Sequence, residues 1–395
     1  MKKFAVGIFV LLGLLYSSNS KSQTDGVSKD FNPIKIGTPF LTIAPDARGA
    51  AIGDQGVAGF ADNNSQYWNP SKYVFTDTKG GGSFTYTPWL NGTSSGMSLC
   101  YLAGYYKLDD IQALSASLRY FTMGSADFTD NDNNPISTFK PNEFSIDIAY
   151  SRKFTKNLSS ALAFKYIRSD IAGNIEQNAV VSKAASSFAA DISLFYQSSS
   201  YSRYNQSEYA FGIIISNIGP KITYSNNDEH KAFLPTSLRI GGRYTAEIQR
   251  DHKLSGLLEI GKLLVPTPDY DENGINKNAN KTVVEGIFSS FGDAPGGFSE
   301  EIKEYTLSVG GEYSFQNKFF ARLGYFNESK MKGNRKFFSI GAGLKYSVMV
   351  LDLSYLIPTA DAGINPLANT FRITLGTELG QDRYSKSYRR SYRRR

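Results

Sequence analysis

The stretch from Asn142 to Ser151, Asn-Glu-Phe-Ser-Ile-Asp-Ile-Ala-Tyr-Ser, changes character at every step. Residues two apart lie on the same face of a strand, so this period of two separates an apolar face from a polar one. The apolar face carries Phe144, Ile146, Ile148 and Tyr150, and the other carries Ser145, Asp147, Ala149 and Ser151. One face suits lipid and the other suits water. Soluble open sheets also alternate, so the fold class depends on how often the pattern recurs.

From Gly82 onward the same period recurs in fourteen segments, most of them eight to eleven residues long. A tilted strand needs about 9–11 residues to cross a bilayer, and single-chain bacterial barrels have an even number of strands. The segments are Gly82–Leu90, Gly96–Tyr106, Ala113–Thr122, Asn142–Ser151, Leu158–Arg168, Phe188–Gln197, Tyr209–Ser216, Ser237–Ala246, Lys253–Leu263, Tyr305–Phe315, Phe319–Phe326, Phe337–Tyr346, Met349–Ile357 and Phe371–Leu379. The sequence therefore predicts an all-β fold, a transmembrane antiparallel β-barrel of about 14 strands over residues 82–379.

The connections between these segments alternate in length. They are short after the even-numbered strands and longer after the odd-numbered strands, and only the first hairpin, Asn91–Ser95, breaks this parity. Outer-membrane barrels have short periplasmic turns and long external loops. We therefore expect the short connections, together with both termini, on the periplasmic side of the outer membrane.

The two ends of the chain differ from the body. Lys2 and Lys3 precede an apolar run, Phe4–Leu15, and small residues follow before Gln23, which indicates a signal peptide over residues 1–22. Residues 380–395 form a basic tail, whose six Arg and one Lys account for most of the net charge of +7. A tail of this kind is either solvated or rests on anionic lipid or a periplasmic partner.

The chain offers little material for chemistry. It contains one cysteine, Cys100, and two histidines, His230 and His252, that are far apart in the sequence. A Ser–His centre acting on lipid A would have to use one of these histidines, and no motif surrounds either of them. We therefore expect no catalytic residue, no metal site and no cofactor.

Residues 23–81 precede the first strand and are rich in small side chains. A fourteen-stranded lumen is wide, so this segment is predicted to be an N-terminal periplasmic or lumen plug that contains short helices. Asp46 suits the N-cap of a short helix that runs to Ala51.

The run Asp46-Ala-Arg-Gly-Ala-Ala-Ile-Gly-Asp54, followed by Trp68-Asn-Pro70, resembles the N-terminal signature of the FadL-like superfamily of outer-membrane barrels. Within it, the longer run from Gly37-Thr-Pro-Phe to Asp54 is most similar to the PorV family of the type IX secretion system. The motif residues are Asp46, Arg48, Gly49, Trp68, Asn69 and Pro70.

The resemblance implies a non-enzymatic secretion protein of the outer membrane. Such a protein binds the C-terminal signal domain of cargo leaving the translocon barrel. It then delivers that cargo to an attachment complex, whose sortase joins the cargo to lipopolysaccharide. Outer-membrane lipid or lipopolysaccharide is a further expected partner, and nucleic acid is not, because the protein is exported. The alternative is passive transport of hydrophobic molecules, since FadL-like barrels share the plug motif.

The longest connection, Leu264–Glu304, begins with polar turn residues and then becomes apolar and rich in glycine. An apolar segment outside the cell either folds back into the barrel mouth as a lid or docks onto a partner protein. The candidate docking residues are Val283, Val284, Ile287, Phe288, Phe291 and Phe298.

Overall fold

The computed structural model describes residues 31–88, 96–129, 135–171, 176–177, 180–181, 183–201, 206–224, 231–359 and 370–381. The predicted signal peptide, the hairpin residues 91–95, His230 and residues 382–395 of the basic tail lie outside the described residues.

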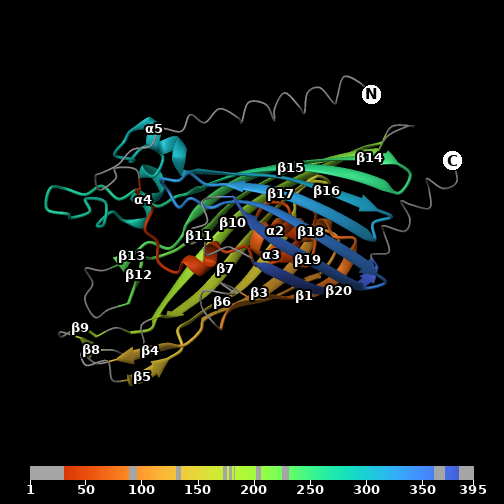
Figure 1. The fold of residues 1–395 in the computed structure, drawn as a ribbon. Helices are drawn as coiled ribbons and strands as arrows, with labels where there is room; N and C mark the ends of the chain where they lie inside the picture. Colours follow the sequence, from red (N-terminus) through yellow and green to blue (C-terminus); the bar gives the residue numbers. More distant parts are fainter. Residues whose placement is uncertain are drawn as a thin grey trace. The chain divides into compact units, whose positions relative to one another are not determined.

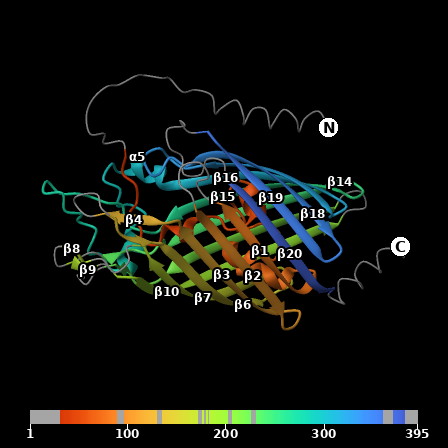
Figure 2. The same ribbon diagram turned by 60° about the horizontal axis from the view of Figure 1, so that its bottom comes forward.

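Fourteen antiparallel strands close into a barrel, as the sequence predicts (Figures 1 and 2). They are β1 (Thr78–Pro88), β2 (Met97–Lys107), β3 (Gln112–Met123), β6 (Asn142–Lys153), β7 (Leu158–Asp170), β10 (Ala185–Tyr201), β11 (Gln206–Ile218), β14 (Ser237–Gln249), β15 (His252–Leu263), β16 (Tyr305–Phe315), β17 (Phe319–Asn327), β18 (Lys336–Tyr346), β19 (Met349–Pro358) and β20 (Phe371–Gln381). Each predicted segment overlaps one of these strands, and β11, which was predicted over Tyr209–Ser216, extends to 13 residues.

Side chains of the wall follow the predicted alternation. In β6, Ile146 and Ile148 are exposed on the outside, whereas Ser145 and Asp147 are buried on the inside. The inward side chains are buried because other parts of the chain fill the lumen. The outward apolar side chains therefore have lipid as their solvent.

The two ends of the barrel differ in their connections. Three two-stranded hairpins lie in the longer connections: β4 (Ala126–Thr129) with β5 (Pro135–Phe139), β8 (Glu176–Gln177) with β9 (Val180–Val181), and β12 (Ile222–Thr223) with β13 (Lys231–Ala232). These hairpins and the loop between β15 and β16 mark what we call the long-loop end, at the left of Figure 1. Tight turns such as Ser347-Val348, between β18 and β19, mark the short-turn end.

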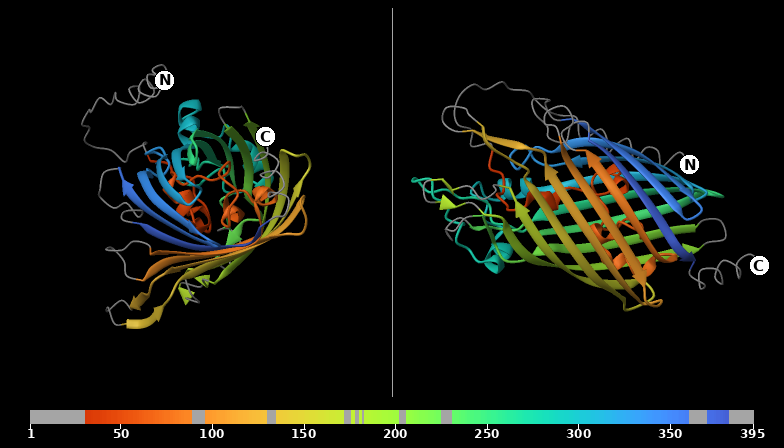
Figure 3. Two further views of the ribbon diagram at one scale, coloured as in Figure 1. Left: turned by 90° about the vertical axis from the view of Figure 1, so that its right-hand side faces the viewer. Right: turned by 90° about the horizontal axis from the view of Figure 1, so that it is seen from below.

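Four short helical elements precede β1: η1 (Pro39–Thr42), α2 (Ala47–Ala51), α3 (Ser65–Trp68) and η2 (Pro70–Phe75). They lie inside the ring of strands, where α2 contacts β17 to β20 and η2 contacts β6, β7 and β10 (Figure 3). The predicted cap of α2 is confirmed, since the Asp46 carboxylate accepts a hydrogen bond from the Gly49 N–H at 2.9 Å. No helix in the described ranges is long and apolar enough to cross a membrane.

The plug runs through the lumen from one end to the other. Asn32 lies at the long-loop end, where its N–H donates to the carbonyl of Met331 at 2.9 Å and its side chain donates to the carbonyl of Pro268 at 3.1 Å. The plug joins β1 at Thr78, at the short-turn end. The expectation that both termini lie on the side of the short turns concerns residues 1–30 and 382–395, which lie outside the described residues. The last strand ends at Gln381, on the expected side.

Strands β1 and β20 pair to close the barrel, and the plug bridges this seam. The side-chain amide of Asn63 donates to the carbonyls of Gly82 at 3.1 Å and Thr377 at 3.3 Å, one on each strand. The Ala47 N–H donates to the Thr374 hydroxyl of β20 at 2.9 Å. Hydrogen bonds from the plug to β1 and β20 therefore help to hold the two closing strands together.

Glycines on the inner wall let the plug backbone touch the strands directly. A Cβ at Gly324 would lie 2.1 Å from the carbonyl carbon of Ile52, and one at Gly310 would lie 2.3 Å from its oxygen. A Cβ at Gly341 would lie 2.4 Å from the Cβ of Ala51. Gly310, Gly324 and Gly341 are therefore positions of close packing, and we call these three residues the glycine seat.

We expect Gly324→Ala to destabilise the plugged barrel by about 1–3 kcal/mol, because the added methyl overlaps the plug backbone. The matched control is Gly256→Ala, since a Cβ at Gly256 on the outer wall meets nothing within 4 Å. The measurement is the thermal unfolding midpoint of the detergent-solubilised barrel, read from its gel mobility. Equal midpoints for the two variants would contradict the seat.

Candidate functional site

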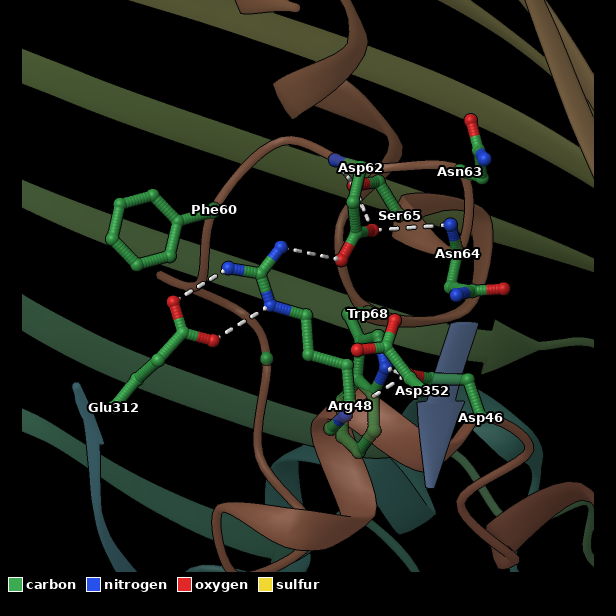
Figure 4. A network of polar contacts seen from close by, with 12 residues as sticks. Asp46, Arg48, Phe60, Asp62, Asn63, Asn64, Ser65, Trp68, Glu312 and Asp352 are labelled. Atoms are coloured by element: carbon green, nitrogen blue, oxygen red, sulfur yellow. Dashed lines mark hydrogen bonds and ion pairs between the residues drawn. The ribbon is translucent and has the colours of Figure 1, made fainter. Parts of the chain in front are cut away.

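Arg48 lies at the centre of a polar network between plug and wall (Figure 4). Its guanidinium binds Glu312 of β16 through two hydrogen bonds, Nη2 to Oε1 at 2.8 Å and Nε to Oε2 at 3.1 Å. Its Nη1 lies 3.4 Å from a carboxylate oxygen of Asp62. Arg322 of β17 binds Glu312 at 2.6 Å and Asp352 of β19 at 2.6 Å. Three strands are thus joined to one plug residue.

These contacts are strong because water is nearly excluded from them. The side chain of Glu312 is 3% exposed and that of Arg48 is 17% exposed, and a bidentate guanidinium–carboxylate pair is the geometry that holds best. The ring of Phe60 lies 4.9 Å from the Arg48 guanidinium carbon and adds a cation–π contact. Sequence reasoning found Arg48 and missed Glu312 and Arg322. Their signal is a charge within an alternating strand, which must point into the lumen.

Asp46, Gly49 and Trp68 form one unit beside this network. The Trp68 indole N–H donates to one oxygen of the Asp46 carboxylate at 2.5 Å, while the other oxygen caps α2. A Cβ at Gly49 would lie 2.3 Å from Cζ2 of Trp68, so only glycine fits beneath the ring. Burial, with the nearby charge of Asp62, raises the pKa of Asp46 to about 6.

Asn69 and Pro70 form a corner of the plug between α3 and η2. The Asn69 side chain accepts a hydrogen bond from the Ser71 N–H at 3.1 Å and so caps η2, in which Pro70 is the first residue. Its amide donates to the carbonyls of Val57 at 3.1 Å and Leu194 at 2.9 Å. All six motif residues therefore serve the plug and its attachment to the wall.

The lumen beside Arg48 leaves little free space. The small pocket lined by Asp46, Arg48, Trp68, Lys72 and Glu312 has room for about one water molecule. The Lys72 ammonium donates to the carbonyl of Gly56 at 2.8 Å, and burial lowers its pKa to about 8. Among the described residues, no group of three or more His, Cys, Asp or Glu side chains could hold a metal ion.

Five of the six candidate docking residues lie on two helices of the loop between β15 and β16, and Phe291 lies between these helices. Helix α4 (Val283–Ser289) begins with a capping box between Thr282 and Glu285, and α5 (Phe298–Glu301) follows. Val284 is 63% exposed, Phe288 74%, Phe291 47% and Phe298 79%, while Val283 and Ile287 are half-buried. The four exposed side chains face outward and do not fill the barrel mouth.

A buried ionic cluster fastens the end of this loop. It is formed by α5, by η4 (Ile302–Glu304) and by two lysines. The Lys262 ammonium lies 2.7 Å from Glu301 and 2.6 Å from Glu304. The Lys332 ammonium lies 2.5 Å from Glu300 and 3.0 Å from Glu304. We call these five residues the ionic latch.

We expect Arg48→Ala to loosen the plug, because removing one partner of a buried ion pair costs about 3–5 kcal/mol. The measurement is the ionic conductance of single barrels in planar bilayers, where the variant should open intermittently. The control is Lys277→Ala, whose ion pair with Asp269 is exposed and adds less than about 1 kcal/mol. Conductance equal to the parent in both variants would contradict the assigned role of Arg48.

Asp46 should make the stability of the plug depend on pH. Its pKa of about 6 in the folded state lies above the value of about 3.9 for an unfolded chain. The folded state therefore binds this proton more tightly, so stability falls as the pH rises from about 4 to 6 and is level above that. In the Asp46→Asn variant, the loss of stability between about pH 4 and 6 should be smaller by about 2 kcal/mol. The measurement is a series of thermal melts across this pH range. Parallel pH profiles for both proteins would refute the assignment.

Comparisons with known proteins agree with this architecture. A family model described as type IX secretion system protein PorV matches residues 27–270. A search of curated protein sequences finds no match. The toluene transporter TodX of P. putida has a TM-score of 0.51 at 8% identity, covering 85% of this chain and 99% of that one. The toluene transporter TbuX of Ralstonia pickettii has a TM-score of 0.50 at 9% identity, covering 86% of this chain and 100% of that one. A Pseudomonas aeruginosa FadL homologue has a TM-score of 0.44 at 10% identity, covering 87% of this chain and 99% of that one.

At 8% and 9% identity, the likenesses to TodX and TbuX concern the fold alone. The family model is more informative, because it covers more than half of the chain and contains the whole motif from Asp46 to Pro70. The chain is an outer-membrane β-barrel, and it belongs to the PorV family of type IX secretion system proteins.

Proposed function

We propose that this protein is a non-enzymatic shuttle that binds the C-terminal signal domain of cargo leaving the type IX translocon. It delivers the cargo to the sortase of the attachment complex. The observation that carries the proposal is the exposed apolar face of α4 at the long-loop end of a plugged barrel. The covalent chemistry belongs to the sortase.

The α4 surface has the character of a protein-binding site. We define it as Val283, Val284, Ile287, Phe288 and Phe291. Exposed apolar side chains that lie together mark sites of protein association, where a few well-packed anchor residues supply most of the binding free energy. The helix is held in place, since a Cβ at Gly286 would lie 2.9 Å from the Phe233 ring and 3.0 Å from Pro266. A rigid surface loses little conformational entropy on binding.

Secretion is favoured over transport of hydrophobic molecules. TodX and TbuX are named as toluene transporters, but the lumen of this chain at the level of the plug holds Arg48, Glu312 and Arg322 in ion pairs. An apolar molecule passing there would have to separate charges that lack access to bulk water. Unchanged uptake of labelled hydrocarbons and fatty acids in a deletion strain is the expected result.

Nothing described supports an enzyme that acts on lipid A. His230 lies outside the described residues, and His252 lies at the short-turn end, opposite the long loops. There the His252 ring makes a 2.6 Å hydrogen bond with the Tyr313 hydroxyl of the adjacent strand.

We expect the double variant Val284→Asp, Phe288→Asp to weaken binding of a purified cargo signal domain by about 30-fold or more, since loss of one anchor costs about 2 kcal/mol. The control is Ile275→Asp, which changes an exposed residue of the same loop outside α4. Binding is measured by titration in detergent, and surface attachment by fractionation of cells. Cargo binding at the parent affinity by a correctly assembled double variant would refute the α4 surface.

A further inference from the structure

The segment formed by α5 and η4 is inside out by the standards of a soluble protein. Glu300, Glu301 and Glu304 are buried in the ionic latch, whereas Phe298 is 79% exposed and Ile302 is 54% exposed. A surface helix of a soluble protein buries its apolar side and exposes its charges. This segment follows the opposite rule, which is the rule of the barrel wall.

The position of Lys262 shows on which side of the wall the segment lies. Leu258, Ile260 and Lys262 occupy alternate positions of β15, so their side chains leave the wall on the same side. Leu258 and Ile260 are exposed on the lipid-facing side, whereas Lys262 is 3% exposed because Glu301 and Glu304 of the segment pair with it.

The segment therefore packs against the outside of the rim and does not cover the mouth. Figure 3, left, looks along the barrel and shows the loop helices, in cyan, outside the ring of strands. Figure 1 likewise shows α5 beyond the edge formed by β15 and β16.

The exposed apolar face of the segment continues the lipid-facing face of the next strand. Tyr305, Leu307 and Val309 alternate along the outside of β16 and are all exposed. Ile302 and Phe298 precede Tyr305 in the chain and are also exposed, so the run of exposed apolar side chains continues beyond the end of the strand. Because the long loops of outer-membrane barrels face the cell exterior, this extension lies at the outer leaflet.

We propose that α5 and η4 form a binding site for lipopolysaccharide on the outside of the barrel rim. Phe298 and Ile302 contact its acyl chains, and Lys303 pairs with a phosphate. Lys303 is exposed and makes no ion pair with any residue that the structure describes. An ammonium group beside an apolar face suits an anionic lipid, whose phosphates lie just outside its acyl chains.

This proposal assigns Phe298 to lipid and leaves the α4 surface to cargo. A membrane occupant is favoured over a protein because the face is continuous with the lipid-facing wall and shares its inside-out pattern. The ionic latch gives the arrangement a physical reason. It pairs the three carboxylates of the segment with Lys262 and Lys332, so that no unpaired carboxylate faces the acyl chains.

The first test places a fluorescent label at Ile302→Cys in a Cys100→Ser background of the full chain. The probe is a nanodisc that contains lipopolysaccharide and a fraction of lipid with a quencher on its acyl chain. Val309→Cys on the lipid-facing wall and Ile275→Cys at an exposed position of the same loop are the reference labels. We expect the label at 302 to be quenched as at 309 and shielded from aqueous iodide. Quenching by iodide as at 275 would overturn the site.

The second test asks whether the lipid is recognised by its charge. Lys303→Gln should weaken binding of fluorescent lipopolysaccharide to the protein in neutral detergent by about fivefold at low salt. Lys277→Gln, in the same loop but paired with Asp269, should leave binding unchanged. Equal affinity of Lys303→Gln and the parent, with equal quenching at 302 in phosphatidylcholine nanodiscs, would overturn the assignment to lipopolysaccharide. Neither test includes cargo, so both are independent of the shuttle proposal.

Discussion

The pair of Arg48 with Glu312 joins the plug to the barrel wall at a depth where both charges are largely shielded from bulk water. Arg322 and Asp352 extend the pair into a network across β16, β17 and β19. The glycine seat allows this closeness, because side chains at Gly310 or Gly324 would push the plug away from the wall. Packing brings the charges together, and exclusion of water makes their attraction strong.

One pattern, charges inward and apolar groups outward, operates at two scales. Along each strand it separates the lumen from the lipid. In the loop between β15 and β16 it recurs over a few residues, where three glutamates face the rim and two apolar side chains face away from it. Helix α4 precedes this segment in the same loop, has its own capping box and carries a second apolar surface. A single loop thus presents two surfaces that we assign to different partners.

Local signals predicted the parts of this structure that depend on neighbours in the chain. The period of two located all fourteen strands, and the Asp46 cap needs only residues up to Gly49. Contacts between distant residues were not predictable in this way. The Arg48 and Glu312 side chains are separated by 264 residues, and no local rule selects Glu312 among the inward-facing charges. The direction of the plug was not predictable either, because composition shows that a segment fills the lumen but not from which end it enters.

The position of Asn63 across the seam has a consequence for how the molecule is assembled. The plug spans the lumen from the long-loop end to the short-turn end, and Asn63 binds both β1 and β20. If the barrel had already closed, the N-terminal segment would have to be threaded through the whole length of the lumen. Wrapping the hairpins around a segment already in place, and then joining the first strand to the last, avoids this passage. The plug thus acts as a template for the barrel, and the topology favours an order of folding in which the strands close around it.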